Sequence, residues 1–134
     1  MIEKIISFLL IVAGIILLLP VIGVIGAERL AIMYGISFQE PNLLILMRHR
    51  AVLFGLLGTF IIYAAFRPSI QPLALLAGFI GAGSFIVLAK AVGAYNATIS
   101  KVVLADIVAV VCLVVAFGLR RMIMRRDGDQ GLRR

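Results

Sequence analysis

Charged residues are scarce in this chain of 134 residues. They make up 14% of the sequence, against about 25% in an average soluble domain. Hydrophobic residues make up 63%, and the mean hydropathy is +1.19. Both departures indicate that lipid is the solvent of most of the chain. At this length the sequence allows one domain.

Cysteine and histidine are nearly absent. Cys112 is the single cysteine, so a disulfide within the chain and a thiolate metal site are both excluded. The single histidine, His49, excludes the paired axial histidines of a membrane cytochrome. No cluster of metal ligands occurs either, and we expect neither a metal nor a cofactor.

Acidic residues are outnumbered by basic ones, 6 to 13, which gives a net charge of +7. Six of the 13 basic residues lie in the last 15 positions, directly after the final hydrophobic run. This pattern is typical of an anchor on the cytoplasmic side of a membrane and not of a nucleic-acid groove binder. We therefore expect no nucleic-acid partner, and we assign residues 120–134 as a basic cytoplasmic tail.

Long hydrophobic runs dominate the remaining sequence. A helix needs about 20 apolar residues to cross the hydrocarbon core of a bilayer. Four runs meet this length and predict helices at about residues 5–27, 42–66, 72–91 and 101–119. We predict an all-α integral membrane protein, an up-down bundle of four helices that forms one transmembrane domain over residues 1–119.

The basic residues also predict the orientation, because Lys and Arg accumulate on the cytoplasmic side. With both termini inside, eight basic residues lie on the inner side and five in the outer part of the chain. We therefore expect both termini in the cytoplasm. The arginines Arg120, Arg121, Arg125 and Arg126 are expected to lie along the inner membrane surface, where each contributes about 1 kcal/mol to binding anionic lipid.

Polar residues inside membrane helices are costly, about 2.5–3.5 kcal/mol for each charge, and are therefore functional candidates. In the predicted topology they gather near the outer surface as one cluster, which comprises Glu28, Arg48, His49, Arg50, Lys90, Asn96 and Asp106. We expect Arg48 to point into the bundle and Arg50 to point outward. Asp106 is expected to pair with one of these two arginines, and Glu28 with another cation.

Three interpretations of this cluster stay open. The favoured one is a structural network in a small accessory or scaffold subunit. The alternative is a binding site for a lipid headgroup or small anion at the outer leaflet, since two helix N-termini point to the same region. An enzyme that uses His49 as acid or base, oriented by Asp106, is the least favoured, and we assign no catalytic residue.

A transporter is disfavoured, because the inner half of the bundle offers only Ser7, Thr59 and Ser69 as polar groups. Small residues also recur at helical spacing and form one face on each of three predicted helices: Ala51, Gly55 and Gly58 on the second, Ala74, Gly78 and Gly81 on the third, and Ala105, Ala109, Cys112 and Ala116 on the fourth. In lipid such faces bring helices close together. They would pack the monomer, or bind a second copy or another subunit of a membrane complex.

Several segments carry a family resemblance: residues 26–30 (GAERL) with Tyr34-Gly35, residues 41–58, which include 46–51 (LMRHRA), and residues 65–68 (AFRP), together with Tyr95-Asn96 and Asp106. On these the chain resembles a family of small uncharacterised bacterial membrane proteins of four helices, similar in layout to DoxX-like proteins. The resemblance implies the bacterial inner (plasma) membrane and brings no activity. Members sometimes carry the label phosphopantetheine adenylyltransferase. That enzyme family is soluble and α/β, so the sequence does not support the label.

Overall fold

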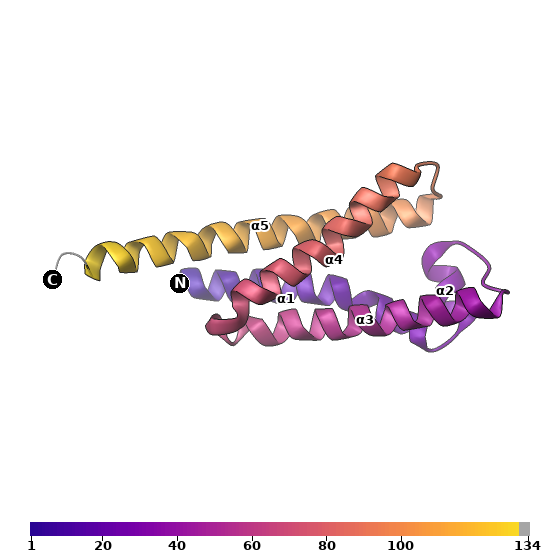
Figure 1. Cartoon of the computed structure of the whole chain (residues 1–134), viewed down its shortest axis with the longest axis horizontal. Helices are drawn as coiled ribbons and strands as arrows, with labels where there is room; N and C mark the ends of the chain where they lie inside the picture. Colours follow the sequence, from indigo (N-terminus) through magenta and orange to yellow (C-terminus); the bar gives the residue numbers. More distant parts are fainter. Residues whose placement is uncertain (132–134) are drawn as a thin grey trace.

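The computed structural model describes the backbone of residues 1–131 and the side chains of residues 1–126. Over this range the chain is helical and contains no strand (Figure 1). Its elements are α1 (Ile2–Leu18), η1 (Leu19–Val24), α2 (Ala27–Tyr34), α3 (Pro41–Ala65), η2 (Pro68–Ile70), α4 (Gln71–Val92) and α5 (Ala97–Gly131), where η marks a 3-10 helix. The predicted all-α class is confirmed.

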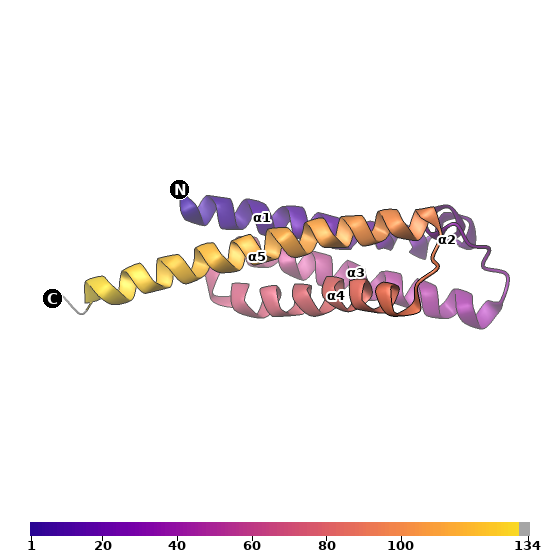
Figure 2. The ribbon, with the colours of Figure 1, turned by 90° about the horizontal axis from the view of Figure 1, so that it is seen from above.

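Four segments are long and apolar enough to cross a membrane: Ile2–Val24, Pro41–Ala65, Pro68–Val92 and Ala97–Arg126. They run up and down beside one another, and α4 crosses the bundle obliquely (Figures 1 and 2). Both α1 and α4 pack against α3 and α5. These four helices fit a multi-pass membrane protein, as predicted.

The bundle has two distinct ends. Met1, the turn between α3 and α4, and the final turns of α5 lie at one end, which we call the terminal end (Figure 1). The short helix α2 and the connection between α4 and α5 lie at the other, which we call the loop end. Arg50 and Asp106 lie in the half of the bundle nearer the loop end, and Arg120 lies at the terminal end.

The first predicted helix, residues 5–27, is wrong in its bounds. Its α-helical part ends at Leu18, where Pro20 removes a backbone donor and the Leu19 N–H bonds to the Ile16 carbonyl instead of one four residues back. The chain continues as η1 to Val24 and breaks before α2. The helix α2 was not predicted, because it is short and ends at Gly35, which is in the left-handed conformation.

The fourth predicted helix, residues 101–119, is too short at both ends. It begins at Ala97 and continues without a break through Gly131. Arg and Met are strong helix formers, and neither Gly nor Pro occurs between residues 119 and 127. As far as residue 131, the basic segment that we assigned as a separate tail from residue 120 is therefore a helical extension of α5, and residues 132–134 lie outside the described residues.

Small residues set the distance between α1 and α3. A Cβ atom on Gly58 would lie 2.7 Å from the Gly14 carbonyl oxygen and 2.9 Å from the Leu18 nitrogen. Members of all three predicted small-residue faces are buried, namely Ala51, Gly58, Ala74, Gly78, Ala109 and Ala116. Much of each face therefore packs inside the bundle, where close backbone approach replaces the hydrophobic effect.

Glu40 fixes the start of α3 and therefore the positions of Arg48 and Arg50 along the bundle axis. Its carboxylate accepts hydrogen bonds from the backbone N–H groups of Asn42 and Leu43, at 3.0 and 2.6 Å. These bonds, of which the one from the Asn42 N–H has the largest effect, hold the pKa of Glu40 below its ordinary value. Pro41 occupies the first helical position, where its missing N–H costs nothing.

Candidate functional site

A cavity of about 340 Å³ lies in the half of the bundle nearer the loop end, between α1, η1, α2, α3 and α5. Ligand pockets commonly have about 300–1,000 Å³. Its polar lining consists of Tyr34, Arg50, Thr98, Lys101 and Asp106, and its apolar lining includes Ile16, Leu19, Met33, Phe54 and Val102. We call it the loop-end cavity. It joins two residues of the predicted cluster, Arg50 and Asp106, with three residues outside it.

Several contacts hold Arg50 at this cavity. It is half-buried, and its Nη1 donates to the Tyr34 hydroxyl at 2.8 Å. Its guanidinium carbon lies 5.4, 4.9 and 5.0 Å from the ring centroids of Tyr34, Phe54 and Phe85. Cations are attracted to aromatic rings at such distances. Three helices therefore position this cation, while only one of its five N–H donors is bonded to a described residue.

Asp106 reaches the same cavity from α5. Its side chain is 5% exposed, and its neighbour Ala109 is fully buried. Within residues 1–126 the guanidinium groups of Arg48 and Arg50 bond to Val24 and Tyr34, and neither bonds to Asp106. The expected ion pair is therefore not formed. A carboxylate and a guanidinium instead face one shared hollow.

The predicted directions of the two arginines are wrong. Arg48 is exposed, and its Nε and Nη2 donate to the Val24 carbonyl at 2.9 and 2.7 Å. This carbonyl belongs to the last residue of η1, where no following helical N–H takes it. Arg48 lies on the same face of α3 as Ala51, and this face packs toward η1. Because η1 ends at the level of Arg48 along the bundle axis, the arginine side chain is exposed there. Arg50 lies on a second face of α3, which also packs inside the protein.

Asn96 is used to join two helices. Its Oδ1 accepts from the Ile99 N–H at 2.8 Å, which caps α5. Its Nδ2 donates to the carbonyls of Tyr34 and Gly35, at 2.9 and 3.3 Å. The side chain thereby fixes the end of α2 against the start of α5 and helps to place Tyr34 beside the loop-end cavity.

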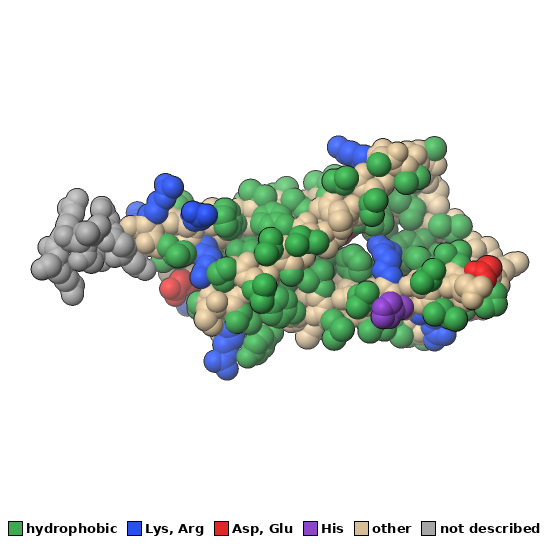
Figure 3. All heavy atoms as spheres, in the orientation of Figure 1, with side chains coloured by type: hydrophobic (Ala, Val, Ile, Leu, Met, Phe, Trp, Pro, Cys, Tyr) green, Lys and Arg blue, Asp and Glu red, His purple; other side chains and the backbone are tan. Residues whose placement is uncertain are grey.

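The other members of the predicted cluster lie outside the cavity. Glu28, His49 and Lys90 are all exposed, and none lines it. Figure 3 shows the histidine on the surface, with charged groups gathered toward the two ends of a largely hydrophobic bundle. Because His49 does not face the cavity that Asp106 lines, the arrangement of an acid-base histidine oriented by Asp106 is not formed.

Sequence reasoning missed Tyr34, Thr98 and Lys101. Residues 98, 101, 102, 105 and 106 follow the helical spacing of one face, so a helix started at Ala97 would have placed Thr98 and Lys101 beside Asp106. The predicted start at residue 101 hid this relation. Tyr34 gave no comparable signal, because its position depends on the unpredicted helix α2.

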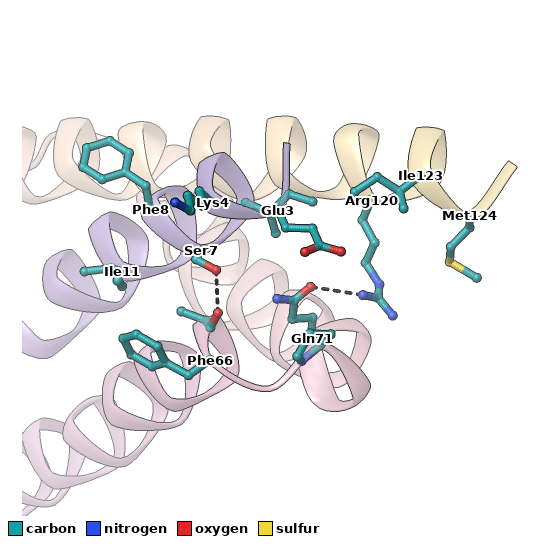
Figure 4. Close-up of a pocket in the computed structure, with 13 residues that line it drawn as sticks. Glu3, Lys4, Ser7, Phe8, Ile11, Phe66, Gln71, Arg120, Ile123 and Met124 are labelled. Atoms are coloured by element: carbon teal, nitrogen blue, oxygen red, sulfur yellow. Dashed lines mark hydrogen bonds between the residues drawn. The ribbon is translucent and has the colours of Figure 1, made fainter. Parts of the chain in front are cut away.

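A second polar site lies at the terminal end, in a cavity of about 570 Å³ (Figure 4). Its polar lining is Glu3, Lys4, Ser7, Gln71 and Arg120. Gln71 is buried and its Oε1 accepts from Arg120 Nη1 at 3.0 Å, while the Ser7 hydroxyl donates to the Ala65 carbonyl at 2.6 Å. The expectation that this half offers only Ser7, Thr59 and Ser69 is wrong, because the extension of α5 brings Arg120 against Gln71.

No protein-family model, curated protein or solved structure matches the chain. Its function is therefore inferred from the geometry of the chain itself.

Proposed function

We propose that this protein binds a lipid headgroup or small anion in the loop-end cavity. The observation that supports the proposal is the placement of Arg50 beside that cavity with only one of its N–H donors bonded to a described residue. A planar guanidinium that is already oriented matches the oxygens of a phosphate or carboxylate. Lys101 supplies a second cation on the same cavity, from α5.

Asp106 narrows the class of ligand. A carboxylate in the cavity repels a bare anion, but it accepts hydrogen bonds from a hydroxyl or an ammonium group. A ligand with an anionic group for Arg50 and Lys101 and a donor for Asp106 satisfies all three side chains. Phospholipid headgroups with a phosphate and a terminal hydroxyl or amine have this combination.

A second candidate is an accessory or scaffold subunit of the membrane. Arg48 and Asn96 favour it, because both side chains are used to fix η1, α2 and α5 relative to one another. Its partner would be a second copy or another membrane subunit. In this case the polar residues at the loop end serve only the fold, and no ligand depends on Lys101.

Lys101→Gln is expected to weaken headgroup binding about fivefold, since one cation near an anionic group contributes about 1 kcal/mol. The measurement is the rise in unfolding temperature of the purified protein on titration with short-chain phosphatidylglycerol, with inorganic phosphate as a parallel probe. Lys90→Gln is the matched control, because it removes the same charge at the same end but outside the cavity.

The response to each probe identifies the ligand. Stabilisation by both probes, weakened in Lys101→Gln, indicates a phosphate site. Stabilisation by the lipid alone, weakened in the same variant, indicates a headgroup site. Equal responses of the two variants, or no response of the unmodified protein, would overturn the binding function and leave the scaffold.

We further propose that the bundle lies in the bacterial inner membrane with its terminal end in the cytoplasm. The excess of Lys and Arg on that side supports this orientation. A cytoplasmic reporter fused after Arg134 is expected to be active, and a reporter that works only after export is expected to be silent. Activity of the exported reporter would reverse the orientation.

A further inference from the structure

A groove of about 520 Å³ runs between α4 and α5 toward the terminal end. Its lining is apolar apart from two arginines and consists of Pro72, Leu75, Leu76, Phe79, Phe117, Arg120, Arg121 and Met124. Phe79 and Phe117 lie seven residues from Pro72 and Met124, which is about 10 Å along each helix. The groove is therefore apolar in its deeper part and cationic nearer the end of the bundle.

Each arginine of the groove contacts a neighbouring side chain. Arg120 donates to the buried Gln71 side chain at 3.0 Å, and Figure 4 shows it extended from α5 toward α4. It lines both this groove and the terminal-end cavity. The Arg121 guanidinium carbon lies 5.2 Å from the ring centroid of Phe117. Two oriented cations thus stand at the shallow part of an apolar groove.

We propose that this groove binds one anionic phospholipid from the leaflet at the terminal end. Its phosphate bonds to Arg120 and Arg121, and one acyl chain lies along Phe79 and Phe117. The groove runs along the helices, as acyl chains run in a bilayer. Acid groups are absent from its described lining, and in the adjoining cavity Glu3 is balanced by Lys4. The local charge of the two arginines therefore matches an anionic headgroup.

Two further arginines of α5 allow a specific lipid site to be distinguished from general attraction to a basic surface. Arg125 and Arg126 are exposed on the same helix, as Arg121 is, but they lie about one turn further on and line neither hollow. General attraction to an anionic surface depends on all four arginines alike. A specific lipid site in the groove depends on Arg120 and Arg121 and not on Arg125 and Arg126.

The first test compares paired substitutions in the full chain. Purified protein is equilibrated with equal amounts of dioleoyl phosphatidylglycerol and dioleoyl phosphatidylcholine, and retained lipid is counted by native mass spectrometry. Arg120→Gln with Arg121→Gln is expected to reduce retained phosphatidylglycerol about tenfold or more, since bonds to charged groups are lost. Arg125→Gln with Arg126→Gln is expected to leave it within about twofold. Equal losses in the two pairs would overturn the site.

The second test leaves every charge in place and so covers the case in which the first pair folds poorly. Leu76 is exposed and lines the groove, whereas Ile80 is exposed on the same helix outside it. Leu76→Trp is expected to fill the groove and reduce retained phosphatidylglycerol about tenfold, because the acyl chain loses its contacts. Ile80→Trp is expected to change nothing. Unchanged retention in Leu76→Trp would overturn the acyl-chain placement.

These tests are independent of the loop-end cavity. They use residues at the opposite end of the bundle, so failure of the headgroup function leaves their outcome unaffected. Both tests are repeated in the Lys101→Gln background, which weakens any phosphatidylglycerol held in the loop-end cavity without touching the groove.

Discussion

Gly58→Ala is expected to lower the free energy of unfolding by about 3 kcal/mol or more, at the upper end of the cost of overpacking a core. The added methyl group would lie 2.7 Å from the Gly14 carbonyl oxygen and 2.9 Å from the Leu18 nitrogen. Both are backbone atoms of α1. A flexible side chain could turn aside, but here α1 and α3 must separate along their length.

Gly83→Ala is the matched control. Gly83 lies in the interior of α4, and a Cβ atom built on it meets no atom within 4 Å. Since Ala is favoured over Gly in a helix by about 1 kcal/mol, this variant is expected to be neutral or slightly more stable. Gly14→Ala is expected to resemble Gly58→Ala, because its Cβ would lie 2.9 Å from the Gly58 carbonyl oxygen.

The measurement is denaturant unfolding of the purified protein in mixed micelles, followed by helical circular dichroism. The yield of folded protein in the membrane gives a second readout for variants too unstable to purify. If Gly58→Ala were as stable as Gly83→Ala, α1 and α3 could not approach as closely as the structure has them.

The four crossings could be predicted from the sequence because hydropathy reports which residues lie in lipid. Hydropathy does not report where a helix ends. Pro20 lies inside an apolar run, so the hydropathy pattern does not show the change from α1 to η1. Arg120 and Arg121 end the apolar run of α5 but not its helix, since a basic residue is a good helix former.

The candidate site was predicted in part for a related reason. Arg50 and Asp106 stood out because each is a charge within an apolar run. Their directions did not follow, because the prediction gave α3 one interior face and the structure gives it two. Gln71 was overlooked, since a neutral amide beside Pro72 reads as part of a loop. Only its contact with Arg120 shows its role.

Arg50→Met is expected to lower the free energy of unfolding by about 3 kcal/mol. It removes a charge-assisted hydrogen bond to Tyr34, which contributes roughly 1.5–3 kcal/mol. It also removes a cation beside three aromatic rings, each worth about 0.5–1 kcal/mol. The substitution also removes the cost of placing a charge in lipid. This gain offsets little of the loss in stability, because the unfolded reference state already has Arg50 in the membrane. Denaturant unfolding in mixed micelles measures the difference.

Two other variants separate these contributions. Tyr34→Phe keeps the ring and removes only the hydroxyl, so it is expected to cost about 1–2 kcal/mol, less than Arg50→Met. Arg48→Met removes a guanidinium two residues away that is exposed and, among the described residues, bonded only to the Val24 carbonyl. Solvent or headgroups can replace that partner, and its cost is expected to stay near 1 kcal/mol.

A double-mutant cycle with Asp106→Asn tests whether the two charges of the loop-end cavity act together. Arg50→Met leaves the Asp106 carboxylate, 5% exposed, beside a cavity that has lost the cation supplied by α3. Removing both charges is therefore expected to cost about 0.5–3 kcal/mol less than the sum of the single costs, the range for groups that share a cavity. Strict additivity would mean that Arg50 stabilises the fold through Tyr34 and the rings alone, and that the cavity carries two independent charges.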